Sequence, residues 1–83
     1  MNNLELVANL IKAQLTDAKV DVSDMTGTED HLEITIASDA FRGKMLLQQH
    51  RMIMDILTEA LAGPVHAVKL KTMTLDKYTG EQA

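Results

Sequence analysis

The chain has no cysteine and no tryptophan, and only one phenylalanine and one tyrosine among its 83 residues. Without cysteine it has no disulfide, no thiol nucleophile and no thiolate site for zinc or an iron–sulfur cluster that it could build alone. With so few aromatic side chains it lacks the platforms on which single-stranded bases stack. Any thiolate in a metal site must therefore come from a partner.

Long apolar runs and an excess of positive charge are also missing. No apolar run approaches the ~20 residues needed to cross a bilayer, and the first residues lack the basic stretch and apolar core of a secretory signal. We therefore expect a cytoplasmic protein without a membrane partner. The formal net charge of −4 opposes non-specific attraction to a polyanion, although a local basic patch remains compatible with it.

The length limits the domain organisation. A chain of 83 residues forms one small domain, which buries only about 60% of the surface that the unfolded chain exposes. We expect residues 1–83 to form this single domain, with residues 1–3 and 79–83 as frayed ends. The isolated protein is expected to be a monomer or a weak homodimer.

The first half of the chain predicts one helix followed by two strands. Apolar residues recur at helical spacing from Leu4 to Leu15, which predicts an amphipathic helix. Apolar and polar residues then alternate over Ala18–Ser23 and over His31–Ile36, as in half-buried strands. The turn-forming segment Thr26–Asp30 lies between them, so we expect an antiparallel hairpin.

The second half begins with an amphipathic helix after Phe41. This helix must end at Gly63-Pro64, because glycine favours a left-handed C-cap and proline lacks the N–H that would continue the helix. The apolar and polar positions recur at steps of three and four residues, which predicts one buried and one exposed stripe. The buried stripe is expected to contain Leu46, His50, Ile53, Leu57 and Ala60, and the exposed stripe Lys44, Gln48, Arg51, Asp55 and Glu59.

The last predicted strand covers Val65–Met73, with Lys69 and Lys71 on its exposed side. A strand–helix–strand unit within one sheet favours a parallel crossover. We therefore expect an α/β fold in one small domain, in the order α-β-β-α-β, with a three-stranded mixed sheet and short helical turns around Phe41 and after Thr74. The opposite side of the last strand is expected to carry His66, Val68, Leu70 and Thr72.

Three short elements in the order F-x-G-K, Q-H-R and H-A-V-K resemble the BolA family, and the resemblance extends from Leu4 to Thr74. It implies the α-β-β-α-β fold expected above, which is similar to a type II KH domain. KH domains clamp a nucleic-acid backbone with a G-x-x-G loop, but the candidate segment Gly43–Leu46 has no second glycine. The residues that carry the resemblance are Phe41, Gly43 and Lys44, then His50 and Arg51, then His66, Ala67, Val68 and Lys69.

The resemblance implies a metal-ligand role for two histidines. In BolA-like proteins the histidine of the last element ligates a [2Fe–2S] cluster shared with a monothiol glutaredoxin, and here it is His66. The loop between the first two strands carries a second ligand, cysteine or histidine, and His31 looks like the histidine version. Such a cluster needs four terminal ligands, so the glutaredoxin cysteine and glutathione would supply the thiolates.

Each histidine also has a plainer interpretation. Taken alone, His66 reads as an imidazole packed at the start of a strand, and His31 as a solvated residue on the polar side of its strand. The wide spacing of the three histidines does not by itself indicate a metal site. His50 falls in phase with the buried helical stripe, so we expect it to be structural and partly buried.

Five basic residues form a candidate binding surface: Arg42, Lys44 and Arg51 near the start of the main helix, and Lys69 and Lys71 on the last strand. Most such residues are simply a solvated face. They could also dock the glutaredoxin, which fits the acidic chain better, or contact DNA phosphates, since some BolA-like proteins are described as transcriptional regulators. Salt-tolerant binding would favour the first function and steep salt dependence the second.

The sequence gives little support for an enzyme. It contains no G-x-S-x-G, no phosphate-cradling glycine loop and no H-E-x-x-H. Ser38 and Asp39 are interpreted as helix-capping residues rather than a catalytic pair. The six methionines are interpreted as adaptable packing, with an exposed subset available for partner binding. The resemblance to the BolA family instead implies a protein without turnover chemistry, which alters the stability, potential or destination of a partner's cluster.

Overall fold

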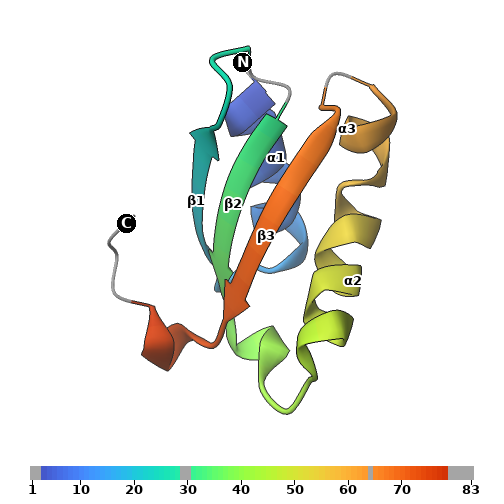
Figure 1. Cartoon of the computed structure of the whole chain (residues 1–83). Coiled ribbons are helices and arrows are strands. Elements are labelled where there is room, and N and C mark those ends of the chain that lie inside the picture. The colour runs from blue at the N-terminus through green and yellow to red at the C-terminus, as the bar shows by residue number, and fades with distance from the viewer. Residues whose placement is uncertain (1–2, 29–30, 64, 79–83) are drawn as a thin grey trace.

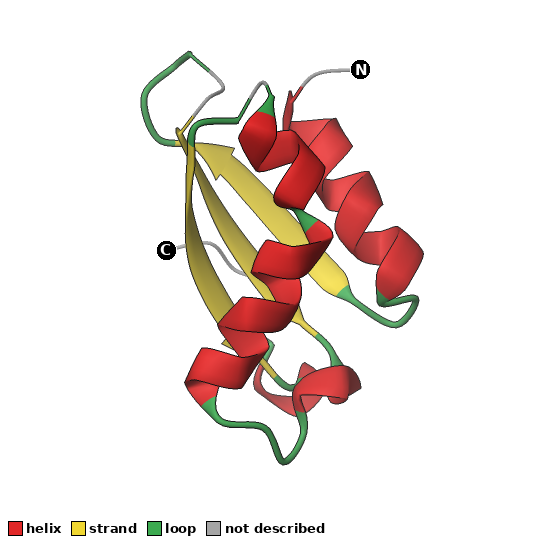
Figure 2. Cartoon of the chain, turned by 90° about the vertical axis from the view of Figure 1, so that its right-hand side faces the viewer, coloured by secondary structure: helices red, strands yellow, loops and turns green. Residues whose placement is uncertain are grey.

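The computed structural model describes residues 3–28, 31–63 and 65–78. Its three-stranded sheet is covered on one side by the helices α1, α2 and α3 (Figures 1 and 2). This is the predicted small α/β fold, with a 3-10 turn, η1, before α2 and another, η2, after the last strand. The elements are α1 Asn3–Gln14, β1 Lys19–Asp24, β2 His31–Ala37, η1 Asp39–Phe41, α2 Leu46–Ile56, α3 Thr58–Ala62, β3 Ala67–Met73 and η2 Leu75–Lys77.

The sheet has the order β1-β2-β3. β1 pairs with β2 in antiparallel orientation, with Lys19 opposite Ala37. β2 pairs with β3 in parallel orientation, with His31 opposite Ala67 and Ala37 opposite Met73. The sequence predicted an antiparallel hairpin from two neighbouring strands and a parallel crossover from the strand–helix–strand order. Both pairings are confirmed.

The core lies between the helical layer and β2, the central strand. Leu32, Ile34 and Ile36 on β2 are all fully buried. Burying an aliphatic side chain of this size contributes roughly 1.5–3 kcal/mol, so this strand is a main source of stability. The helices complete the core with buried apolar side chains, including Val7, Ile11, Ile53, Leu57 and Ala60.

The main helix differs from its prediction in two ways. It is interrupted at Leu57, so that α2 and α3 are separate elements. The Thr58 hydroxyl donates to the carbonyl oxygens of Met54, at 3.2 Å, and Asp55, at 2.9 Å. It therefore competes with backbone amides for the acceptors of the regular helical hydrogen bonds. Leu46, predicted to be buried, is the first residue of α2 and is 60% exposed, so the buried stripe does not extend to the first turn of this helix.

The predicted left-handed cap at Gly63 is wrong. Gly63 has φ −119° and ψ −113°, outside the left-handed region. The chain leaves α3 because the amides of Gly63 and Val65 both donate to the carbonyl oxygen of Ala60, at 3.2 and 3.0 Å. The described glycines with positive φ are Gly27 and Gly43, at 84° and 78°, and both lie in turns.

Ser38 and Asp17 anchor the turn that follows β2. The fully buried Ser38 hydroxyl donates to Asp17 Oδ1 at 2.7 Å and accepts from the Ala40 amide at 3.1 Å. The other Asp17 oxygen accepts from the Asp39 amide at 2.9 Å. These hydrogen bonds hold the pKa of Asp17 below its ordinary value of 3.8, and the one from Ser38 has the largest effect. The capping interpretation of Ser38 is therefore confirmed.

The end of the described chain folds back on β1. The predicted turn after Thr74 is present as η2, and the Tyr78 hydroxyl that follows it donates to Asp21 Oδ2 at 2.6 Å. This hydrogen bond raises the pKa of Tyr78 above its ordinary value of 10.0. Residues 79–83 and 1–2, predicted to fray, lie outside the described residues, whereas Asn3 is the first residue of α1.

Candidate metal-ligand site

His31 and His66 are brought together by the strand register. His31 is the first residue of β2 and lies opposite Ala67, the first residue of β3. His66 is the residue immediately before β3, so it is the neighbour of the residue paired with His31. The sequence alone gave no geometry for this pair, because the register of a parallel crossover cannot be counted from the chain.

The two imidazole rings form an edge-to-face pair. Their centroids are 6.2 Å apart and their planes are perpendicular. His66 is exposed and His31 is half-buried. The separation is comparable with the reach of two imidazoles that bind one metal centre at ~2 Å from each ligating nitrogen. The pair is thus open to solvent and to a partner, as a shared ligand site requires.

Within the part of the chain that the structure describes, His31 and His66 do not make a complete ligand set. Among the described residues, no group of three or more histidine, aspartate or glutamate side chains could hold a metal ion. The sequence has no cysteine. His31 and His66 can therefore supply two nitrogen ligands, and a partner would supply the remaining ligands of a four-coordinate shell.

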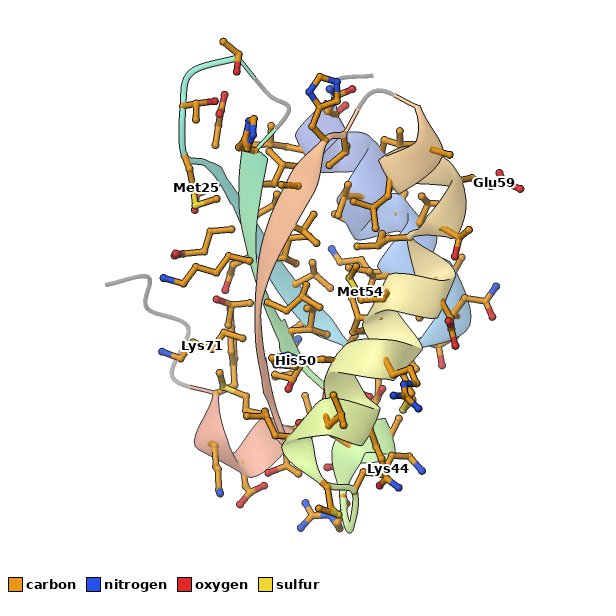
Figure 3. All side chains as sticks on the ribbon, turned by 45° about the vertical axis from the view of Figure 1, so that its right-hand side comes forward. Met25, Lys44, His50, Met54, Glu59 and Lys71 are labelled. Atoms are coloured by element: carbon orange, nitrogen blue, oxygen red, sulfur yellow. The ribbon has the colours of Figure 1, made fainter. Side chains whose placement is uncertain are left out.

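His50 lies outside this site. It belongs to α2, extends towards the sheet (Figure 3) and is half-buried, as the helical phase predicted. Its Nε2 is enclosed and has no hydrogen-bond partner among the described residues. His50 therefore has the position of a packing residue rather than of a ligand.

The basic residues on β3 lie on the face of the sheet away from the helices. Lys69 and Lys71 are exposed and alternate with the partly buried Val68 and Leu70, as predicted. Figure 3 shows Lys71 on this open face. Lys69 Nζ is 3.9 Å from Glu33 Oε2 in an exposed ion pair, which contributes little to stability.

Two of the other basic residues lie beyond the end of β2 that is opposite to His31. Arg42 and Lys44 follow η1, which begins two residues after the end of β2. β2 has seven residues at ~3.3 Å each, so this end is roughly 20 Å from His31. Arg42 Nη2 lies 3.1 Å from Asp39 Oδ1 and 3.3 Å from Asp76 Oδ1. These two carboxylates, Asp39 more than Asp76, raise the pKa of Arg42. Lys44 lies at the turn before α2, whereas Lys71 lies on the open face of the sheet (Figure 3), so the basic residues do not all share one face.

One exposed feature was missed by the helical phase. Met45, Leu46 and Leu47 are 72%, 60% and 67% exposed at the start of α2. The signal available in the sequence was the run of three large apolar residues directly after Gly43-Lys44, because three consecutive positions cannot all lie on the buried side of an amphipathic helix.

No helix in the described part of the chain combines the length and apolar character needed to span a membrane.

Residues 5–77 match the BolA family, described as BolA-like protein. The chain is 41% identical over 56 residues to the DNA-binding transcriptional regulator BolA of Escherichia coli (strain K12), a match that covers 68% of this chain and 53% of that protein. The matched segment thus spans about half the length of this curated relative.

Solved structures share the fold. The structure of BolA1 from Arabidopsis thaliana superposes with a TM-score of 0.85 at 22% identity, covering 94% of this chain and 98% of that one. The BolA domain of SufE1 from Arabidopsis thaliana superposes with a TM-score of 0.80 at 28% identity, covering 89% and 93%. These structures share the fold of the chain, and the match over residues 5–77 establishes that the chain belongs to the BolA family.

Proposed function

We propose that this protein binds a [2Fe–2S] cluster jointly with a monothiol glutaredoxin, with His66 as its principal ligand and His31 as its second. In this function it acts without catalysis, in the cytoplasm, in iron–sulfur trafficking or in iron or redox regulation. The observation that carries the proposal is the 6.2 Å separation of the two imidazole rings at an exposed end of the sheet.

The available ligands agree with this shared site. A [2Fe–2S] cluster takes four terminal ligands, and this chain offers two imidazole nitrogens and no thiolate. One glutaredoxin cysteine and one glutathione thiolate would complete the shell. Because a partner must provide half of the ligands, the cluster would sit at the interface and its assembly would depend on both proteins.

Imidazole ligation gives the cluster distinct properties. Replacing a thiolate by a neutral imidazole removes negative charge from the cluster and raises its reduction potential. Imidazole binds a metal only when its ligating nitrogen is deprotonated, so acid should release this chain from the cluster. These properties suit a protein that transfers or senses a cluster rather than one that stores it permanently.

The test is a visible circular dichroism titration of cluster-loaded monothiol glutaredoxin, with glutathione present. The wild-type protein should produce a new spectrum that saturates at one-to-one stoichiometry. The His66→Ala variant should lose this spectrum, and His31→Ala should give an altered spectrum with weaker binding. His50→Gln is the matched histidine control, because His50 is half-buried on α2 and away from the pair; it should behave as wild type. A wild-type titration without spectral change would refute the proposal.

DNA binding is the second candidate function, favoured by the exposed Lys69 and Lys71 on one strand and by the printed name of the Escherichia coli relative. If these lysines contact phosphates, log affinity should fall with log salt with a slope of about −0.9 per contact. Lys71→Ala should reduce that slope, measured by fluorescence anisotropy on duplex DNA. Lys12→Ala, which removes an exposed lysine from α1, should not reduce it. Equal effects of the two variants would eliminate a specific phosphate contact at β3.

A further inference from the structure

The start of α2 carries an exposed apolar surface that the histidine site does not use. Met45, Leu46 and Leu47 are consecutive and each is at least 60% exposed. Met54, 41% exposed, follows Leu47 by seven residues and so lies on the same side of the helix. We call these four residues the α2 patch. A single exposed leucine needs no explanation, but four large exposed apolar side chains along one helix indicate an interaction surface.

The backbone under the patch is fixed by local hydrogen bonds. The Met45 amide donates to Gln48 Oε1 at 3.1 Å, and Gln49 Nε2 donates to the Lys44 carbonyl oxygen at 2.9 Å. Gly43, with φ 78°, makes the turn that leads into the helix. The apolar side chains are therefore presented from an ordered helix start. A pre-ordered surface loses little conformational entropy when a partner binds.

Two cations lie beside the apolar side chains of the α2 patch. Lys44 precedes it, and Arg51 lies on α2 between Leu47 and Met54; both are exposed. Neither Lys44 nor Arg51 forms an ion pair with another described residue, whereas Arg42 is held by Asp39 and Asp76. Figure 3 shows Lys44 at the turn before α2 and Met54 farther along the helix. The patch is thus an apolar stripe with unneutralised positive charge at its start and middle.

We propose that the α2 patch docks an acidic amphipathic helix of a second protein. The spacing of Leu47 and Met54 allows the apolar face of a partner helix to lie along α2, which is the usual helix-on-helix geometry. Acidic residues beside that face would meet Lys44 and Arg51. Electrostatic complementarity of this kind selects the partner and fixes its orientation.

Other occupants fit the patch less well. An anionic bilayer is a plane of negative charge that would also face the rest of a chain with net charge −4, whereas a helix contacts the patch alone. Nucleic-acid phosphates would leave four large apolar side chains without a matching surface. The dimensions of the chain, 33 × 25 × 20 Å, leave room for separate partners at its two ends. The inference goes beyond the shared cluster, since a protein docked here leaves His31 and His66 accessible.

The experiment uses the full-length ¹⁵N-labelled chain and two synthetic helical peptides with identical leucine faces. In one peptide the remaining positions are glutamate-rich, and in the other they are lysine-rich. The glutamate-rich peptide should shift amide resonances of residues 44–54 and leave those of His31 and His66 unchanged. Leu47→Asp and Lys44→Glu should each weaken binding by about tenfold or more, as expected for a central contact.

Matched controls separate docking from general stickiness. Lys12→Glu makes the same charge change on α1, and Met25→Asp removes another exposed apolar residue, 47% exposed at the opposite end of the sheet. Both variants should bind the glutamate-rich peptide as wild type does. The inference is overturned if neither peptide binds at about 1 mM, if the lysine-rich peptide binds equally well, or if the shifts map elsewhere. It is also overturned if vesicles of anionic lipid, rather than the peptide, occupy the patch.

Discussion

At the end of the sheet where β2 and β3 begin, His31 and His66 come from distant parts of the sequence and meet because two strands share one register. At the end where these strands stop, Met45–Leu47 form a surface from consecutive residues, held by hydrogen bonds within a few positions. The first surface depends on the whole fold and presents polar ligands. The second is local, apolar and flanked by cations. A domain this small can therefore present two chemically different surfaces about one strand length apart.

The largest expected stability effect tests the core that both ends share. Ile34→Ala, in the fully buried middle of β2, should lower the free energy of unfolding by about 2–5 kcal/mol. Leu46→Ala should change it by less than about 0.5 kcal/mol, because Leu46 is 60% exposed. Urea unfolding of both variants makes the comparison. A loss from Leu46→Ala as large as that from Ile34→Ala would mean that the α2 patch is part of the core.

A smaller effect is expected at the anchor of the turn after β2. Ser38→Ala removes the hydroxyl that caps η1 and should destabilise the protein by about 0.5–2 kcal/mol. Cluster binding at His31 and His66 should persist, since those residues lie at the other end of the strands. Chemical denaturation and the circular dichroism titration measure the two quantities separately. Loss of the shared spectrum in folded Ser38→Ala would show that the two ends are coupled.

The pH dependence of stability sharpens the same comparison. The folded-state pKa of Asp17 lies below its ordinary value of 3.8, so the hydrogen bonds of the Asp17 carboxylate stabilise the fold above pH 3.8. That contribution is lost as the pH falls through the folded pKa, which lies below 3.8. Asp17→Asn should therefore flatten the stability profile below that value, measured by thermal unfolding at a series of acidic pH values. An unchanged acid profile would rule out the Asp17 contribution.

The smallest effect concerns the contact between the end of the described chain and β1. Tyr78 is the only tyrosine in the sequence, so its ionisation can be followed by ultraviolet absorbance. Its pKa should exceed 10.0 in the folded protein and return towards that value in Asp21→Asn. Because the folded pKa is raised, the hydrogen bond stabilises the fold below pH 10 and this contribution disappears as the pH rises through the folded pKa. Identical titrations of the two proteins would contradict this contact.

Periodicity predicted most of the fold because it reports which face of each element is buried. The helix from Leu4 to Leu15 and the alternating strands correspond closely to α1, β1, β2 and β3. Periodicity failed at Leu46, since the stripe continues in sequence beyond the point where the sheet offers a packing surface. It also gave no indication of the interruption at Leu57, which depends on where the Thr58 hydroxyl finds its acceptors.

The candidate site was predicted in part. The resemblance to the BolA family picked out His66 and His31, but their proximity depends on the pairing of His31 with Ala67, which no local pattern specifies. The basic residues were grouped as one candidate surface, whereas Lys71 lies on the open face of the sheet and Lys44 at the turn before α2 (Figure 3). Ion pairing of Arg42 with Asp76 likewise joins segments that are distant in sequence.

The most direct test of shared ligation is pulsed electron paramagnetic resonance of the reduced cluster, assembled from unlabelled glutaredoxin, glutathione and this chain labelled with ¹⁵N-histidine. Directly bound imidazole should give strong ¹⁵N hyperfine couplings, and those assigned to His66 should be absent in His66→Ala. The His50→Gln control should retain every coupling. A cluster spectrum without ¹⁵N coupling from the wild-type chain would contradict ligation by this protein.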